Sequence, residues 1–355
     1  MNLNFYTSLS ETGYGIAGYN IINALLKKNI TVATFMVGGR VCPDCPPSVV
    51  ESVKQSCQRF DNDAPFVKLW HQFDLINRVG RGPYLGWPIF ELDQFNDHEL
   101  LHLKVPDELI VCSNWAADVL KDNGFINVHT VPLGVDNDIF YPSGIHNESG
   151  PYKFYTAGKW ETRKGHDILI NCFSKAFELT DNVELHLLTH NPFLDEQQTQ
   201  YWTNLCKSSK LANKIRIYDR VESQSDVAEF MHQCDCGVFP SRAEGWNLEL
   251  LESMACGKPV ITTNNTAHKD YCNSDNARLI ETPNKELAHD NKWFFGQGNW
   301  AEFDLDEEEQ LIHYMKECYR DRPDNPGGLD TAKQFSWDNS SNILTGVLNG
   351  LTCRV

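Results

Sequence analysis

The sequence predicts an α/β protein with parallel sheets, because short buried strands alternate with amphipathic helices along it. Two apolar runs, 237–239 and 260–262, have the length and the flanking prolines of buried strands. The segment between them has apolar residues at helical spacing, with Asn247 as a suitable N-cap and Gly257 at the position of a left-handed C-terminal cap. Strand, loop, helix and strand in this order form the repeating unit of a parallel sheet.

The same alternation appears at the start of the chain and begins again near its middle. Residues 2–7 and 31–37 are predicted strands on either side of a helix. Residues 153–157 are a predicted strand, followed by a helix over 166–179. The chain therefore contains two α/β patterns rather than one.

A polar, glycine-containing stretch at 143–151 separates the two patterns and is the expected interdomain linker. At 355 residues the chain is long enough for two domains, which we place at 1–143 and 152–337. Two further buried strands of the first domain are predicted at 66–73 and 87–90.

Composition excludes several classes of partner. The formal net charge of -17 argues against binding to nucleic acid and against electrostatic docking on anionic membranes. The first residues lack the basic region of a secretion signal, and no stretch reaches the roughly 18 apolar residues of a membrane span. We therefore expect a cytoplasmic protein with no integral membrane segment and no nucleic-acid partner.

The 12 cysteines are scattered, and several lie inside apolar runs. Without a secretion signal they are expected to be reduced core residues rather than a disulfide framework. Cys42 and Cys45 form a single Cys-x2-Cys pair, for which Cys57 and His71 are only distant additional zinc ligands. No metal site is expected, although whether this pair binds metal stays open.

Two carboxylates in the central segment are candidate binding groups. Glu244 lies in the loop after a predicted strand, and Glu252 lies one turn inside the helix that follows. Such positions converge at the carboxyl edge of a sheet, where the backbone N–H groups of Gly245, Trp246 and Asn247 face the same space. Ionised carboxylates there can accept hydrogen bonds from the paired hydroxyls of a sugar or a ribose. The alternative is a pair of solvated surface carboxylates.

A second candidate site is the basic loop before the helix at 166–179. Lys159, Arg163 and Lys164 lie beside the N-terminus of that helix. Positive charge, N–H donors and the helix dipole together suit a diphosphate. The alternative is a solvated basic loop.

The N-terminal loop contains Gly13, Gly15 and Gly18 in a literal G-x-G-x-x-G pattern. This pattern alone would indicate a dinucleotide site. The acidic residue expected about 20 residues later is missing, and Arg40 at that place would at best suit a 2′-phosphate. The glycines could equally serve only a tight turn.

The segment from Glu244 to Glu252, followed by Ser-Met-Ala-Cys-Gly-Lys-Pro-Val, closely resembles the Glu-x7-Glu signature of retaining glycosyltransferases of family four. The resemblance extends over nearly the whole chain and is strongest over 153–263. It implies the GT-B fold, in which two Rossmann-like α/β domains face each other across a donor-binding cleft. It also implies that the first domain, completed by a C-terminal helix at 338–355, binds the acceptor and that the second domain, 152–337, binds the nucleotide sugar. The chain departs from the family at Trp246-Asn247, where Phe-Gly is usual.

The resemblance implies roles for the acidic and basic candidates. In the family the first glutamate contacts the transferred sugar and the second contacts the nucleotide ribose, which gives these roles to Glu244 and Glu252. Lys164 matches a lysine that neutralises the leaving diphosphate, and Lys159 stands where arginine is usual. Arginine grips phosphate bidentately and lysine does not, so Arg163 is expected to share the task.

Further donor-binding residues follow from the same resemblance. It assigns donor contacts to the four residues that follow Glu244: Gly245, Trp246, Asn247 and Leu248. A glycine-rich loop near the donor phosphate and acceptor corresponds to Gly13 and Gly15. A Trp-x-x-x-Glu pattern makes Glu91 the candidate active-site residue of the first domain, against the alternative of a plain loop carboxylate. His71 is a weaker candidate there.

The implied activity is a metal-independent, hexosyltransferase-like transfer of a sugar, with retention of configuration, from a UDP- or GDP-sugar to the hydroxyl of a saccharide or glycoconjugate. No cofactor is expected beyond the nucleotide sugar as co-substrate. Two alternatives stay open. One is an NADP-dependent oxidoreductase that uses the Gly13 to Gly18 loop. The other is a non-catalytic nucleotide-sugar-binding protein on the same fold.

Overall fold

The computed structural model describes residues 1–144 and 150–352 of the chain. It divides into two compact units, of which unit 1 comprises Met1–Gly134 with Phe335–Val355 and unit 2 comprises Val135–Gln334. Most of the linker expected at 143–151 falls on 145–149, which lie outside the described residues.

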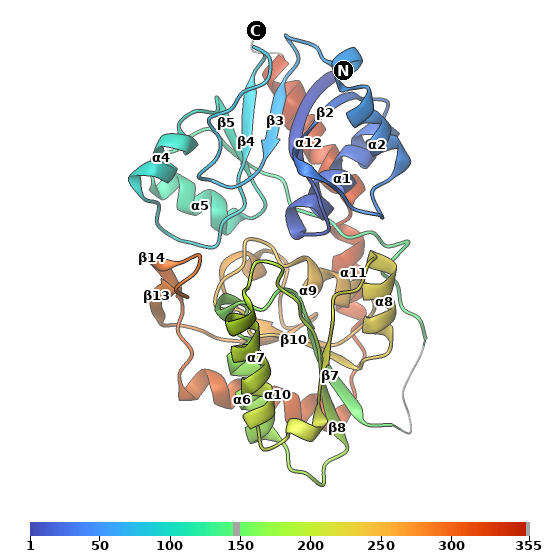
Figure 1. Cartoon of the computed structure of the whole chain (residues 1–355), viewed down its shortest axis with the longest axis vertical. Helices are drawn as coiled ribbons and strands as arrows, with labels where there is room; N and C mark the ends of the chain where they lie inside the picture. Colours follow the sequence, from blue (N-terminus) through green and yellow to red (C-terminus); the bar gives the residue numbers. More distant parts are fainter. Residues whose placement is uncertain (145–149, 353–355) are drawn as a thin grey trace. The chain divides into compact units, whose positions relative to one another are not determined.

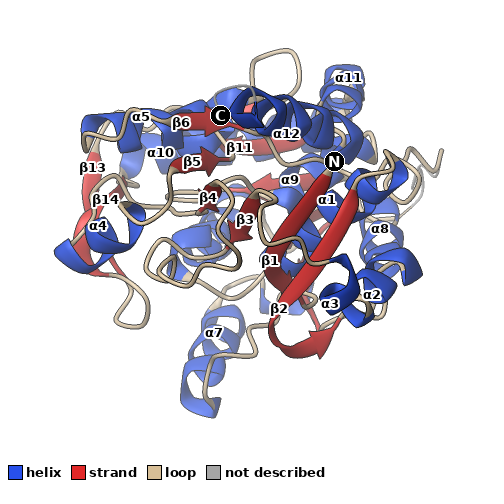
Figure 2. Cartoon of the chain, turned by 90° about the horizontal axis from the view of Figure 1, so that it is seen from above, coloured by secondary structure: helices blue, strands red, loops and turns tan. Residues whose placement is uncertain are grey.

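Unit 1 is built on a parallel sheet of six strands in the order β2-β1-β3-β4-β5-β6. From β1 the chain goes to β2 on one side and then resumes at β3 on the other, so the strand order reverses between β1 and β3. In Figure 2, β1 and β2 run side by side. The strands are β1 (Asn2–Leu9), β2 (Thr31–Val41), β3 (Phe66–Leu69), β4 (Tyr84–Trp87), β5 (Glu108–Val111) and β6 (Val128–Thr130).

The expected strand at 87–90 was wrong, because Trp87 is the last residue of β4 and not its beginning. Pro88 follows it and has no N–H for a ladder hydrogen bond. Phe90 instead packs edge-on against Phe95 in the core, with ring centroids 4.9 Å apart. The strand expected at 66–73 is likewise shorter and ends at Leu69.

The helices of unit 1 surround the sheet, and α1 packs against both α2 and α12. Figure 1 shows α12, from the end of the chain, beside the elements formed by its beginning. The chain comes very close to itself where α12 begins, because a Cβ on Gly134 would lie 2.3 Å from the backbone of Ser336. The helices are α1 (Gly13–Lys27), α2 (Pro47–Lys54), α3 (Ser56–Arg59), α4 (Asp97–Leu103), α5 (Asn114–Asp122) and α12 (Trp337–Thr352).

Unit 2 repeats the architecture with a second parallel sheet, in the order β12-β11-β10-β7-β8-β9. The strand order reverses between β7 and β10, which lie next to each other in the middle of the sheet. Open α/β sheets bind ligands outside the carboxyl ends of the strands at such a point. The strands are β7 (Tyr152–Ala157), β8 (Val183–Leu188), β9 (Ile215–Tyr218), β10 (Cys236–Phe239), β11 (Val260–Thr263) and β12 (Arg278–Ile280).

The helices of unit 2 pack around this sheet, with α6 against both α7 and α10 (Figure 1). An antiparallel hairpin, absent from the sequence-based expectations, follows β12. Its strands are β13 (Lys285–His289) and β14 (Phe295–Ala301). The helices are α6 (His166–Ala176), α7 (Glu196–Ser208), α8 (Gln224–His232), α9 (Leu248–Ala255), α10 (Leu305–Asp321) and α11 (Pro326–Gln334), with short 3₁₀ turns at Thr162–Lys164, Ala212–Lys214 and Thr266–Asp270.

Both expected ends of the central helix α9 are confirmed. The Asn247 side chain accepts a hydrogen bond from the backbone N–H of Leu250 at 3.2 Å, as an N-cap does. Gly257 has a φ of +72°, the left-handed conformation of a helix stop. None of the helices in residues 1–144 and 150–352 combines the length and apolar character needed to cross a bilayer.

The turn at Gly165 before α6 provides a test of how tightly unit 2 is built. Gly165 has a φ of +71°, and a Cβ there would lie 2.0 Å from the carbonyl oxygen of Pro240. We expect Gly165→Ala to destabilise the protein by about 3 kcal/mol or more, because backbone strain and overlap add. Gly124→Ala is the matched control, since Gly124 has a φ of +87° and open space around it, and should cost only about 1 kcal/mol. Equal losses in urea unfolding of the two variants would contradict the close approach.

Candidate functional site

The candidate site lies where the strand order of unit 2 reverses, and two loops form it. The first, 158–165, follows β7, and the second, 240–247, follows β10. They are in direct contact, because the backbone N–H of Arg242 donates to the carbonyl oxygen of Arg163 at 2.7 Å. Residues that are about 80 positions apart in sequence therefore share one site.

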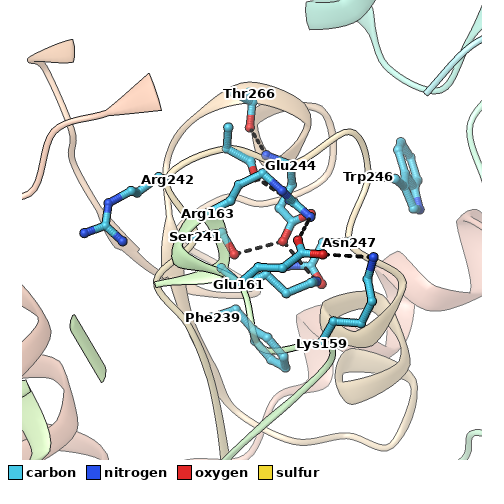
Figure 3. Close-up of polar contacts among 12 residues, drawn as sticks. Lys159, Glu161, Arg163, Phe239, Ser241, Arg242, Glu244, Trp246, Asn247 and Thr266 are labelled. Atoms are coloured by element: carbon cyan, nitrogen blue, oxygen red, sulfur yellow. Dashed lines mark hydrogen bonds and ion pairs between the residues drawn. The ribbon is translucent and has the colours of Figure 1, made fainter. Parts of the chain in front are cut away.

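Arg163 is the centre of a buried network of charges. Its Nη1 donates to the Glu244 carboxylate at 2.7 Å and to the carbonyl oxygen of Ala243 at 2.7 Å, while Nη2 donates to the Glu161 carboxylate at 2.8 Å. Lys159 Nζ lies 2.9 Å from the other oxygen of Glu161. Figure 3 shows the guanidinium between the two carboxylates and the ammonium group of Lys159 reaching Glu161.

Lys164 adds a second cation on the other side of Glu244. Its Nζ lies 3.2 Å from Glu244 Oε1 and 3.6 Å from Glu249 Oε2. Arg163 and Lys164 are almost fully buried, whereas the Lys159 side chain is 37% exposed. Lys159 is therefore the cation of the three that a ligand can reach most directly.

The network keeps its carboxylates ionised although they are buried. Burial by itself opposes ionisation of Glu244, but Arg163 and Lys164 outweigh it and hold its pKa well below the usual range. In the same way Arg163 and Lys159 overcome burial and lower the pKa of Glu161 to about 2. The carboxylates in turn outweigh the burial of Lys164 and raise its pKa. The site thus has fixed charges at neutral pH.

Several groups of the protein hold Glu244 in place. Its carboxylate also accepts a hydrogen bond from Ser241 Oγ at 2.9 Å, and its backbone N–H donates to Thr266 Oγ1 at 2.9 Å. A carboxylate has about four acceptor positions, and Arg163, Lys164 and Ser241 occupy three of them. One position is left for a ligand hydroxyl.

Glu252 is in the opposite situation. The residue is 5% exposed, yet its carboxylate forms no hydrogen bond or ion pair with any residue in the described ranges. Burial, and after it the nearby charge of Glu249, raise its pKa well above the usual range. Buried polar groups in proteins are normally hydrogen-bonded, so an unsatisfied carboxylate in a ligand crevice is a candidate binding group.

The loop after Glu244 is fixed by a residue that the sequence analysis missed. Asn247 has a φ of +79°, and its Nδ2 donates to Nε2 of the fully buried His268 at 3.1 Å. His268 Nδ1 donates to the carbonyl oxygen of Thr263 at 3.0 Å. Burial lowers the pKa of His268 to about 4, so the ring stays neutral and can accept. The histidine thereby holds Asn247 in the left-handed conformation, which glycine adopts most easily.

The other predicted residues of this loop line the same turn. Trp246 is 2% and Leu248 is 8% exposed. The Trp246 ring packs on Tyr271, whose hydroxyl donates to the Trp246 carbonyl oxygen at 2.8 Å. The backbone N–H groups of Gly245 and Asn247 make no hydrogen bond within the described part of the chain. Whether they contact a ligand stays a prediction.

In unit 1, the predicted residues lie around Tyr14 at the start of α1. The Tyr14 hydroxyl donates to the carbonyl oxygen of Ile89 at 2.7 Å, and its ring centroid is 4.5 Å from that of His71. Burial, followed by the charge of Glu91, raises the pKa of Tyr14. Glu91 and His71 are thus brought together at the carboxyl edge of the unit 1 sheet.

The glycines of this region have different roles. A Cβ on Gly15 would lie 1.9 Å from the carbonyl oxygen of Ser10, and one on Gly18 would lie 2.7 Å from Ser8. Packing alone therefore requires these two glycines. A Cβ on Gly13 would have nothing within 4 Å, so Gly13 is the glycine of the pattern that is free to meet a ligand.

Sequence reasoning missed four residues of the site: Glu161, Ser241, Thr266 and His268. Glu161 had a signal, because a single acid between two cations in a short loop suggests an internal ion pair. The other three had none, since their contacts depend on how the chain folds back. Within the described residues no group of three or more histidine, cysteine or acidic side chains is arranged to hold a metal ion, and Cys42 and Cys45 are both buried thiols.

The unsatisfied Glu252 gives a prediction about pH and stability. Burial raises the pKa of Glu252 in the folded protein, so the folded state holds this proton more tightly than the unfolded chain, whose glutamates have the ordinary pKa of 4.5. The carboxyl therefore costs stability as the pH rises above that value, and Glu252→Gln should remove the cost. In thermal unfolding without ligand, we expect the variant to melt higher than the native protein at pH 8, with the advantage vanishing towards pH 4.

The matched control is Glu222→Gln, which removes an equal charge from an exposed loop position. It should leave the melting temperature nearly unchanged at both pH values. A Glu252→Gln protein that melts lower than the native one at pH 8 would show that the carboxylate is a structural group.

Comparison with known proteins shows what this part of the chain is similar to. Residues 142–299, which contain all the unit 2 candidates, match the family model described as glycosyl transferases group 1. A curated relative, mannosylfructose-phosphate synthase of Agrobacterium fabrum, is 30% identical over 193 residues, which are 49% of this chain and 42% of the relative. A probable sucrose-phosphate synthase of Thermosipho melanesiensis is 28% identical over 41% of this chain and 33% of the relative. The chain thus spans less than half of the length of these relatives.

Solved structures show the fold over the whole chain. A sucrose-phosphate synthase from Thermosynechococcus elongatus superposes with a TM-score of 0.75 at 14% identity and covers 100% of both chains. Anabaena HepE, solved in complex with UDP and glucose, superposes with a TM-score of 0.71 at 14% identity over 98% of this chain and 99% of the other. The two parallel-sheet units therefore form the GT-B fold. The segment 142–299, which contains the charge network, matches the family model of the glycosyl transferases group 1.

Proposed function

We propose that this protein is a retaining glycosyltransferase of family four. In this proposal it moves a sugar from a UDP- or GDP-sugar to a hydroxyl of a saccharide or glycoconjugate. Support comes from the family match over 142–299 and from relatives that are named as synthases of sugar phosphates. The structure of HepE with UDP and glucose is a further reason to test UDP first.

The observation that carries the proposal is the buried, unsatisfied carboxylate of Glu252, one turn inside α9. Both of its oxygens are available to accept hydrogen bonds from the two neighbouring hydroxyls of a ribose. Retaining an unpaired carboxylate in this position lowers stability, which a binding role explains and a structural role does not.

Lys159 and Lys164 are the proposed partners of the diphosphate. They lie before the N-terminus of α6, an 11-residue helix whose dipole adds to their charge. Arg163 was expected to share this task, but in the structure its guanidinium contacts Glu161, Glu244 and a backbone carbonyl. We assign Arg163 the role of positioning Glu244.

The reaction in this proposal depends on electrostatic stabilisation. When the bond between sugar and phosphate breaks, negative charge grows on the diphosphate, and the two lysines stabilise it in the transition state. Glu244 offers its one remaining acceptor position to a hydroxyl of the transferred sugar, and the N–H groups of Gly245 and Asn247 contribute donors. The departing phosphate takes the acceptor proton, so the scheme uses neither a metal ion nor another cofactor. Glu91 is the proposed active-site residue of unit 1.

The alternative of an NADP-dependent oxidoreductase has little left to support it. Packing explains Gly15 and Gly18, and Arg40, the residue suited to a 2′-phosphate, pairs with Glu11. The alternative of a non-catalytic nucleotide-sugar-binding protein predicts donor binding without sugar transfer to any acceptor.

Calorimetric titration with UDP, GDP and NADPH in EDTA tests the donor site. We expect one nucleoside diphosphate to bind, with affinity reduced about 10- to 100-fold in Glu252→Ala, because charged hydrogen bonds to the ribose are lost. Glu309→Ala is the control, because Glu309 is exposed on α10, and it should bind as the native protein does. Binding of NADPH alone, or unchanged nucleotide affinity in Glu252→Ala, would overturn the proposal.

Removing the charge of Glu249 is expected to raise the nucleotide affinity rather than lower it. Its carboxylate lies 3.6 Å from Lys164 and competes with a diphosphate for that cation. We expect Glu249→Gln to raise the affinity for the nucleoside diphosphate about three- to tenfold at low salt, and less at high salt, because a repelling charge is removed. A loss of affinity would mean that Glu249 itself binds the nucleotide. Glu309→Gln controls for the change in net charge.

A further inference from the structure

The loop that carries Glu244 packs against the 3₁₀ turn after β11. We call residues 244–247 the signature loop and residues 266–271, the 3₁₀ turn with its C-cap, the supporting turn. Glu244 is bonded to this turn twice, because its backbone N–H donates to Thr266 Oγ1 at 2.9 Å and its carbonyl oxygen accepts from the N–H of Ala267 at 3.3 Å. Figure 3 shows the contact between Thr266 and Glu244. Thr266 has a φ of +42°, which is rare for a β-branched residue.

Tyr271 bonds the other end of the signature loop to the same turn. Its hydroxyl donates to the carbonyl oxygen of Trp246 at 2.8 Å and lies 3.2 Å from that of Asn247. Its buried ring packs on the Trp246 ring, with centroids 4.9 Å apart. The signature loop is therefore fixed at its first residue and at its last two.

His268 completes this support, and the hydrogen bonds around it define its tautomer. Asn247 Oδ1 accepts from the backbone N–H of Leu250, so the amide nitrogen of Asn247 faces His268 Nε2 at 3.1 Å. Nε2 must therefore accept, and the ring hydrogen lies on Nδ1, which donates to the carbonyl oxygen of Thr263 at 3.0 Å. His268 is fully buried, so this pair of side chains is shielded from solvent.

The pair of Asn247 and His268 stabilises an unfavourable backbone conformation. Asn247 has a φ of +79°, which costs free energy in a residue with a Cβ and persists where surrounding contacts enforce it. Both polar ends of its side chain are occupied, one by Leu250 and one by His268. The group that Asn247 can offer to a ligand is therefore its backbone N–H, whose direction follows from the enforced conformation.

The part of the loop that precedes Glu244 is anchored separately by Arg242. Its Nε donates to Glu286 on β13 at 3.0 Å, and its carbonyl oxygen accepts from the N–H of Ala301 on β14 at 2.9 Å. Its two Nη atoms contact Asp167 on α6. In Figure 3 the Arg242 side chain points away from the Glu244 network. Loss of contacts from the supporting turn should therefore leave the hairpin, and the loop up to Arg242, in place.

Resting on the proposed function, we propose that the supporting turn is the positioning element for the transferred sugar, with His268 and Tyr271 as its positioning residues. They orient the backbone N–H groups of Gly245 and Asn247, which the proposed function assigns to that sugar. Both act through the signature loop rather than by contact with the donor. In the same proposal Glu252 and the two lysines hold the nucleotide part. Weakening the turn should therefore reduce the affinity for the sugar part of the donor and spare the nucleotide part.

Calorimetric titration that compares nucleotide sugars with bare diphosphates tests the proposal. The probes are UDP-glucose, UDP-galactose, UDP-N-acetylglucosamine and GDP-mannose, compared with UDP and GDP. His268→Leu fills the buried space but cannot accept from Asn247. We expect it to weaken the tightest nucleotide sugar about five- to tenfold and the corresponding diphosphate less than about twofold, because the sugar loses oriented donors. Tyr271→Phe removes one hydroxyl without changing the ring and should weaken the nucleotide sugar about three- to fivefold, again sparing the diphosphate.

Two rescues separate positioning from packing. His268→Gln, whose amide oxygen can accept from Asn247, should retain most of the affinity that His268→Leu loses. Asn247→Gly, added to His268→Leu, should restore most of it, because glycine adopts the left-handed conformation without support and is tolerated at an N-cap. Asn29→Gly is the matched control, since Asn29 is an exposed asparagine of unit 1 with a φ of +60°, and it should bind as the native protein does.

Three results would overturn the proposal: equal losses for nucleotide sugar and diphosphate, no loss in either His268→Leu or Tyr271→Phe, or no recovery when Asn247→Gly is added. Nucleotide binding by the native protein in these cases would leave the proposed function standing. Absence of binding of every probe to the native protein would instead reject the proposed function, and the positioning role with it.

Nitrogen-15 NMR of histidine-labelled protein tests the support itself, without a nucleotide. We expect the hydrogen of the neutral His268 ring on Nδ1 and none on Nε2. The spectrum of His268→Gln identifies the His268 signal by its absence. A hydrogen on Nε2 would overturn the role of His268 as the acceptor for Asn247.

Discussion

The ion pairs of Arg163 with Glu161 and Glu244 are the interaction on which the site depends. Three charged side chains are buried together, and a buried charge is tolerated only when its partners are in place. The guanidinium joins the loop after β7 to the loop after β10, at the point where the strand order of unit 2 reverses. Lys159 and Lys164 take their positions from the same two carboxylates. The charges that a diphosphate would meet are therefore arranged before it arrives.

Glu244 and Glu252, the two carboxylates of the signature, have opposite surroundings. Glu244 is held by three side chains, whereas Glu252 has no hydrogen-bond or ion-pair partner among the described residues. Their pKa values move in opposite directions because one carboxylate is surrounded by cations and the other is buried beside a second acid. Such opposed environments are typical of functional sites, which give up stability for binding.

Local signals predicted the fold where they were strong. The N-cap at Asn247, the C-terminal stop at Gly257 and most strands of both sheets are short-range features of the chain. The strand expected at 87–90 was wrong because the prediction followed the apolar character of these residues. In the structure β4 ends at Trp87, directly before Pro88. The hairpin escaped notice because its strands pair only with each other and β13 is largely exposed, so it lacks the apolar alternation that marks a half-buried strand.

The sequence by itself determined the α/β class, the candidate residues of the site and the resemblance that the family match over 142–299 bears out. These depend on spacing along the chain, which a sequence records directly. Only the tertiary structure decided that Arg163 faces inward, that His268 supports Asn247 and that Arg242 ties the hairpin to the site. Each of these contacts joins residues from 21 to about 80 positions apart, and whether a side chain meets solvent or a distant partner is fixed by the packing of the sheet and its loops.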